Sequence, residues 1–131
     1  MRRNRIGKGR ESMYMYRKQL EQAFCRKISG ELAIFRYEIL QEEKETIYQA
    51  AYQIDSIISI YELLAEMSGR LSTETLEAAV MFPNILAFLY GEWLKYEDSY
   101  TADIQYCLDK ELTKLRRDYM EIKEENMVWR N

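Results

Sequence analysis

Apolar residues recur at helical spacing over most of the chain, and this periodicity constrains the fold more than any other feature. From Met13 to Ile39 the steps are three or four residues, which is typical of an amphipathic helix. The stripe is Met13, Tyr16, Leu20, Phe24, Ile28, Leu32, Phe35 and Ile39. It predicts one long helix over residues 12–43. A break at Gly30 is the alternative, because glycine inside a helix costs about 1 kcal/mol relative to alanine.

Further stripes and stop signals predict the remaining helices. A wide stripe from Ile47 leads to a stop at Ser68 and Gly69, and a stripe of that width faces a core on more than one side. Ser72 is a candidate N-cap for a short helix that ends at Phe82. Pro83 then suits the first position of a helix that runs to Tyr96. The last helix is expected over residues 101–127.

No segment of useful length alternates as an amphipathic strand does, so the predicted fold class is all-α. We expect a small helical bundle of two or three long helices with a short central helical hairpin. The expected core includes Ile54, Ile58, Leu64, Ile85, Leu89, Leu108 and Leu115.

The net charge of −3 hides a strongly dipolar chain. Residues 1–30 hold nine basic and two acidic side chains, whereas residues 31–131 hold ten basic and twenty acidic ones. The first ten residues carry five positive charges and two glycines, a composition that cannot bury apolar surface. We therefore predict a basic, flexible leader over residues 1–11 and a single helical domain over residues 12–131.

The chain contains no histidine, which excludes Ser-His-Asp and Cys-His nucleophiles and any zinc site that uses imidazole. Its two cysteines, Cys25 and Cys107, are too few for a disulfide scaffold or a four-cysteine metal site. Paired glutamates on helix faces do not indicate a di-iron centre, because such bundles also use Glu-x-x-His elements. We predict a non-enzymatic protein without a metal or other cofactor.

The basic N-terminal residues are not followed by the apolar segment that a secretory signal needs. The most apolar stretch, residues 78–90, is shorter than the roughly 20 residues of a membrane-spanning helix. We therefore expect a cytoplasmic protein with no membrane partner.

Aromatic and acidic side chains gather around the predicted joint between the last two helices. Rings of this kind supply contact area at protein interfaces, and the carboxylates would steer the approach of a basic partner. The candidate partner-binding residues are Glu92, Trp93, Tyr96, Glu97, Asp98, Tyr100 and Asp103. In the alternative interpretation, the rings pack on the core and the carboxylates only cap the last helix.

The basic leader offers a second candidate surface, for phosphate or nucleic-acid contact without sequence readout. Its residues are Arg2, Arg3, Arg5, Lys8 and Arg10. The alternative is a leader that only solubilises the chain. Pairing of long helical stripes between two copies would give a homodimer.

The order of several short segments resembles that of a family of short, uncharacterised all-helical proteins encoded on Firmicutes prophages and other mobile elements. The resemblance covers residues 47–112 and rests on Ala50-Ala51-Tyr52, Leu71-Ser72, Pro83-Asn84, Tyr90-Gly91-Glu92-Trp93-Leu94-Lys95 and Ser99-Tyr100-Thr101-Ala102-Asp103-Ile104. It implies no catalytic residues.

The resemblance implies a protein that binds and modulates or inhibits a larger host machine, such as a CRISPR nuclease or a transcription complex, with an acidic, aromatic-rich surface. An anti-CRISPR-type inhibitor is one form of this expectation. The alternative function is a nucleic-acid-associated regulator that uses the basic N-terminal arm.

Overall fold

The computed structural model describes the backbone of residues 2–96 and 103–130, and the side chains of residues 9–96 and 103–125. The described backbone forms α-helices and no strand, which confirms the all-α fold class. The helices are α1 (Arg2–Leu40), α2 (Lys44–Gln49), α3 (Ala51–Met67), α4 (Thr73–Met81), α5 (Ile85–Tyr96) and α6 (Ile104–Arg130).

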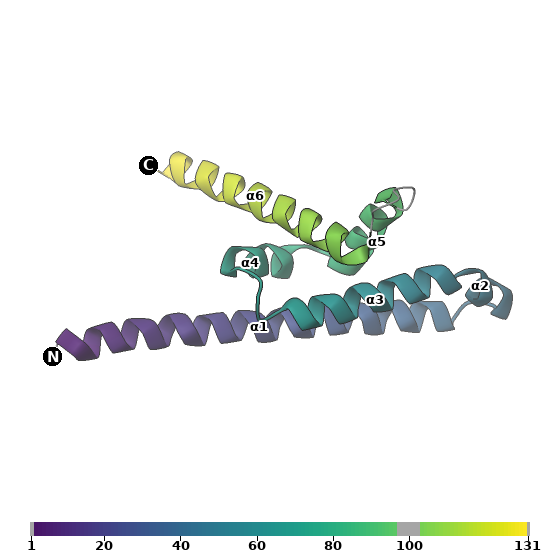
Figure 1. Ribbon diagram of the computed structural model, residues 1–131, viewed down its shortest axis with the longest axis horizontal. Coiled ribbons are helices and arrows are strands. Elements are labelled where there is room, and N and C mark those ends of the chain that lie inside the picture. The colour runs from purple at the N-terminus through teal and green to yellow at the C-terminus, as the bar shows by residue number, and fades with distance from the viewer. Residues whose placement is uncertain (1, 97–102, 131) are drawn as a thin grey trace.

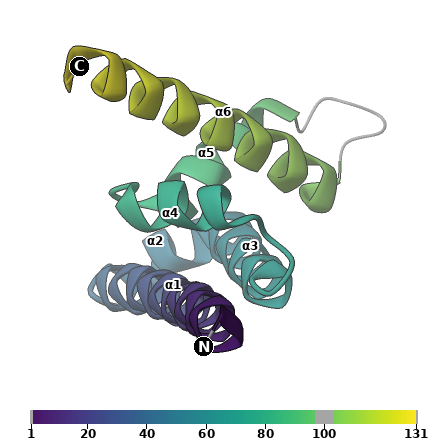
Figure 2. The ribbon, with the colours of Figure 1, turned by 90° about the vertical axis from the view of Figure 1, so that its left-hand side faces the viewer.

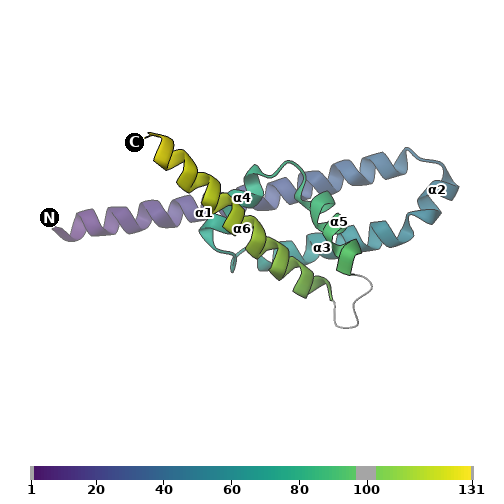
Figure 3. The same cartoon turned by 90° about the horizontal axis from the view of Figure 1, so that it is seen from above.

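The helices are arranged in three layers, as the end-on view shows (Figure 2). The long helix α1 and the returning helix α3 lie side by side and antiparallel, and α2 joins them at one end (Figures 1 and 3). The short helices α4 and α5 form the middle layer, and α6 crosses above them. The N-terminal part of α1 and the C-terminal part of α6 both extend past α4 toward the same end of the molecule (Figure 1).

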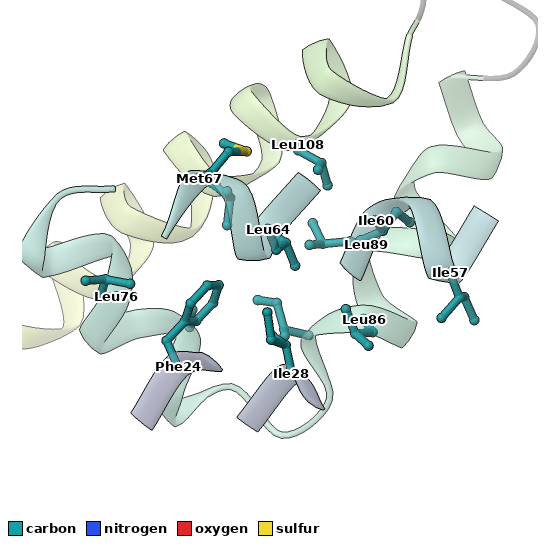
Figure 4. Packing of buried hydrophobic residues seen from close by; sticks show 13 residues of the cluster. Phe24, Ile28, Ile57, Ile60, Leu64, Met67, Leu76, Leu86, Leu89 and Leu108 are labelled. Carbon is teal, nitrogen blue, oxygen red and sulfur yellow. The ribbon is translucent and has the colours of Figure 1, made fainter. Parts of the chain in front are cut away.

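The core lies where α1, α3, α4, α5 and α6 meet (Figure 4). Phe24 and Ile28 of α1 are fully buried and point toward Leu64 of α3. The other fully buried large side chains are Ile60 of α3, Leu76 of α4, Ile85 and Leu89 of α5, and Cys107 and Leu108 of α6. The prediction of core positions is confirmed for Leu64, Ile85, Leu89 and Leu108, whereas Leu115 is partly buried against this cluster.

The predicted core position of Ile58 is wrong, because 39% of this residue is exposed. Its neighbour Ile57 is buried instead. Successive residues point about 100° apart around a helix, so the two side chains face different sides of α3. Ile54, also predicted as core, is only partly buried and lies on the side of Ile58. The wide apolar stripe of α3 therefore faces two sides of the helix, and only the side that carries Ile57 faces the core.

Helix α1 begins at Arg2, ten residues before the predicted start at Ser12, and it continues without a break through Gly30. Nothing in residues 2–11 stops a helix, because the segment contains no proline and its glycines only weaken helix formation. The predicted flexibility of residues 1–11 stays a prediction.

Other helix boundaries also differ from prediction: α1 ends at Leu40 and not at residue 43, and α6 ends at Arg130 and not at residue 127. The stripe that begins at Ile47 is divided at Ala50, where α2 ends and α3 begins. Pro83 lies outside α5 because the side chain of Asn84 accepts a hydrogen bond from the Ala87 amide (3.1 Å) and caps the helix. Asp103 caps α6 in the same way, through the Tyr106 amide (2.7 Å), so α6 begins at Ile104 instead of residue 101.

None of the helices in the described part of the chain has both the length and the apolar character needed to cross a membrane.

Truncation of a fully buried side chain should lower stability strongly. We expect Leu108→Ala to reduce the free energy of unfolding by about 2–5 kcal/mol, because it removes apolar burial and leaves a cavity. Ile122→Ala on the same helix is the control, since Ile122 is 58% exposed, and it should have little effect. Urea denaturation followed by circular dichroism measures both, and equal losses would contradict the assignment of the core.

Deletion of residues 1–11 should leave stability nearly unchanged. Residues 9–16 are exposed, so the change in unfolding free energy should stay within about 0.5 kcal/mol. Hydrogen exchange should also be fast in residues 1–11 of the intact protein. Protection of these amides equal to that of Phe24 would show that the segment docks on the folded domain.

Candidate protein-binding surfaces

The aromatic residues at the end of α5 have polar contacts inside the molecule. The Trp93 indole donates a hydrogen bond to the Tyr52 hydroxyl of α3 (2.9 Å), and the Tyr96 hydroxyl donates one to Glu111 of α6 (3.0 Å). The Tyr96 ring meets the Tyr106 ring edge-on, with centroids 6.3 Å apart. The hydrogen bonds of Trp93 and Tyr96 therefore join α5 to α3 and α6.

Three polar groups lie behind this joint: the carboxylate of Glu111, the hydroxyl of Tyr96 and the thiol of Cys107. Glu111 is buried, and it also accepts a hydrogen bond from Lys114 (3.3 Å). Burial, together with the nearby Glu111, raises the pKa of Tyr96 to about 12 and that of Cys107 to about 11. The Cys107 thiol therefore stays protonated near neutral pH and is unsuited to act as a nucleophile.

Four of the seven residues predicted for the joint, Glu92, Trp93, Tyr96 and Asp103, belong to the described part of the chain. Glu92 is paired with Lys95 of its own helix (3.0 Å), and Asp103 is the cap of α6. The predictions for Glu97, Asp98 and Tyr100 lie outside the described residues. Partner binding at this joint stays a prediction.

A second polar contact joins α1, α4 and α6. The Tyr119 hydroxyl donates a hydrogen bond to the Glu77 carboxylate (2.6 Å), and Lys123 lies 3.9 Å from the same carboxylate. This hydrogen bond, burial and the charge of Glu77 raise the pKa of Tyr119 to about 12. Burial and Glu77 also raise the pKa of Tyr16. The site thus holds two neutral phenols around one carboxylate.

An apolar groove of about 400 Å³ lies between α1 and α3, next to α2. Sequence reasoning did not predict it, although the unusual width of the α3 stripe was a signal. Its apolar wall residues are Leu32, Phe35, Ile39, Leu40, Ile47, Ile54, Ile58 and Tyr61, and its polar residues are Arg36 and Glu62. Leu40 is 58% exposed, so the groove presents apolar surface to solvent.

The end of the molecule that contains this groove is acidic and carries exposed tyrosines. Residues 36–66 include seven acidic and two basic side chains. Tyr48 of α2 and Tyr37 of α1 are 79% and 66% exposed. The chemistry expected of the joint, aromatic rings among carboxylates, is therefore also present on α1, α2 and α3.

A hollow of similar size, about 410 Å³, lies between α4 and α6. It is lined by Met81, Phe82, Leu115, Tyr119 and Ile122, together with Ala78, Pro83, Asp118 and Lys123. One acidic and one basic residue in its lining give it no dominant charge.

The basic N-terminal surface is only partly described. Arg10 is exposed on α1, whereas the side chains of Arg2, Arg3, Arg5 and Lys8 lie outside the described set. Contact of these residues with phosphate or nucleic acid stays a prediction. Among the described residues, no group of three or more cysteine or acidic side chains is placed to hold a metal ion.

No protein-family model, curated protein or solved structure matches the chain. The resemblance to mobile-element proteins therefore stays a prediction.

The raised pKa values of Tyr96 and Tyr119 predict a loss of stability at high pH. Unfolded tyrosine ionises near pH 10, so between about pH 10 and 12 the unfolded chain releases protons that the folded chain retains. The free energy of unfolding should fall over this range. Tyr96→Phe combined with Tyr119→Phe should make the fall shallower, whereas the control Tyr48→Phe should not. Urea denaturation at several pH values tests this, and identical slopes would contradict it.

Proposed function

We propose that this protein is a non-enzymatic interaction module that binds a larger host protein and modulates or inhibits it by occupying a basic surface. The observation that carries the proposal is the acidic end formed by α1, α2 and α3, where exposed Tyr37 and Tyr48 accompany an apolar groove. We call residues 36–66 the acidic end.

The chemistry of the acidic end suits a basic protein partner. Exposed aromatic rings supply contact area with few rotatable bonds, and residues of this type are enriched at interface hot spots. The excess of carboxylates attracts a basic surface and repels nucleic acid. A nuclease or transcription complex has such basic surfaces where it holds nucleic acid, and the acidic end would compete with the phosphates there.

The helical hairpin holds this surface in a fixed shape. Within the acidic end, Leu64 anchors α3 in the core, and Ile28 anchors α1 in the core before the acidic end begins. A surface built on anchored helices loses little conformational freedom on binding, so more of the interaction energy remains as affinity.

Site-specific photocrosslinking tests which surface meets the partner. Replacement of Tyr48 by p-benzoylphenylalanine should give a discrete covalent adduct after irradiation in a lysate of the native host. The same replacement at Tyr106, which is exposed beside the α5–α6 joint, is the matched position at the other candidate surface. Adducts from position 106 alone would support the joint instead, and no adduct from position 48 contradicts the proposal.

Charge reversal on α3 supplies an independent test once the adduct is identified. Asp55→Lys combined with Glu62→Lys should weaken binding at least tenfold, or about 1.4 kcal/mol, because both carboxylates are exposed on the acidic end. Glu121→Lys combined with Glu124→Lys on α6 changes the net charge equally and should leave binding intact. Equal losses in the two variants would indicate an effect of total charge and not of this surface.

A further inference from the structure

The groove between α1 and α3 has the features of a site for a helix. The residues that line each wall recur at helical spacing. They are Leu32, Phe35 and Ile39 on α1, and Ile54, Ile58 and Tyr61 on α3. The two walls run antiparallel beside each other (Figure 3). The opening is therefore elongated along the helix pair, and side chains from an elongated partner would enter it at successive turns.

The apolar surface of this groove has no cover among the described residues. All its lining residues come from α1, α2 and α3, while α4, α5 and α6 pack on the core side of the same two helices. Ile58 and Leu40 consequently remain 39% and 58% exposed. Contiguous apolar surface that stays in water on a folded protein marks a binding site.

The secondary structure of an occupant follows from the chemistry of the walls. The amide and carbonyl groups of α1 and α3 are already hydrogen-bonded within those helices. An occupant of the groove can therefore contact the walls almost only through side chains. A segment that enters this groove must satisfy its own backbone hydrogen bonds, because unpaired buried amides are costly. An α-helix does so, and apolar residues at i, i+3, i+4 and i+7 would form the inserted stripe.

The two rims of the groove differ in charge, and this difference orients the occupant. Glu62 lies on the α3 rim, and Asp55 lies seven residues earlier on the same face of that helix. Arg36 lies on the α1 rim. A helix with Lys or Arg along the flank that faces α3 would therefore match the α3 rim.

We propose that the α1–α3 groove binds an amphipathic α-helix of the partner protein, with the apolar stripe of that helix in the groove and its basic flank along Asp55 and Glu62. This inference rests on the proposed function and names the segment of the partner that the acidic end recognises. A second copy of this chain is a poorer match, because its most basic region, residues 1–11, contains only two large apolar residues and two glycines.

Three labelled peptides of about fifteen residues serve as probes, a length at which isolated helices begin to form. The first has leucine at helical spacing and lysine elsewhere, the second has the same composition in scrambled order, and the third has glutamate in place of lysine. We expect the first to bind the full-length protein, as measured by fluorescence anisotropy, and the other two to bind at least tenfold more weakly. Equal binding of the scrambled peptide would overturn the proposal, because attraction by net charge would then explain the result.

Variants of the protein locate the binding site of the first peptide. Ile58→Lys places a charge in the groove and should weaken binding at least tenfold, and Leu40→Lys is a second variant at a more exposed position near the end of α1. Ile122→Lys on α6 is the control, because Ile122 is as exposed as Leu40, and it should bind normally. Circular dichroism checks that each variant is folded. Unchanged binding by folded Ile58→Lys and Leu40→Lys would overturn the proposal.

Two further measurements separate this inference from its alternatives. If sedimentation shows a wild-type dimer that Leu40→Lys dissociates, the groove is occupied by a second copy and the proposal is wrong. Ile58→Lys should also reduce the photoadduct at position 48 at least tenfold. If the adduct persists undiminished, the acidic end still binds the partner but the groove does not, so the proposed function survives and this inference fails.

Discussion

The carboxylate of Glu31 joins the lower and middle layers of the molecule beside the buried core. It accepts a hydrogen bond from the Leu86 amide in the first turn of α5 (2.9 Å) and pairs with Lys27 one turn earlier on α1 (2.6 Å). An amide in a first helical turn has no partner within its own helix, and the N-terminus of a helix favours negative charge. Glu31, which belongs to α1, supplies both a hydrogen-bond acceptor for the Leu86 amide and a negative charge at the N-terminus of α5. Because Ile28 lies on nearly the same side of α1, the polar contact and the buried core select one orientation of that helix.

This orientation also explains why the groove exists. Once the side of α1 that carries Phe24, Ile28 and Glu31 is turned to α4 and α5, the residues nearer α2 contact α3 only in part. Helix α3 likewise turns Ile57, Ile60 and Leu64 to the core and leaves Ile58 on another side. The middle layer covers one face of the α1–α3 pair, and the apolar side chains of the other face remain in water. The groove is therefore a consequence of packing a three-layer fold on a helical hairpin longer than its core.

The sequence predicted the helices better than it predicted what each helical face contacts. The predicted core positions Leu64, Leu89 and Leu108 are fully buried, and each belongs to a segment with a strong apolar pattern. The prediction of Ile58 as a core residue was wrong, because periodicity shows that the apolar stripe is wide but does not show which half of it contacts the other helices. The prediction for Pro83 was also wrong, because the capping hydrogen bond of Asn84 outweighs the preference of proline for a first helical position. The contacts of Trp93 and Tyr96 join residues 41 and 15 positions apart, and no local pattern contains that information.

The uneven distribution of charge along the chain gives the molecule two chemically different ends, and this separation matters for recognition. The basic N-terminal part of α1 extends past α4, while α2 and the adjoining parts of α1 and α3 lie toward the other end of the molecule (Figure 1). Charges separated by several Debye lengths do not cancel each other in physiological salt, where that length is about 8 Å. Each end therefore presents its own field to an approaching molecule, despite a net charge of only −3. A basic helix is attracted to the end that carries the apolar groove and repelled from the other end, so electrostatic steering and apolar burial act at the same site.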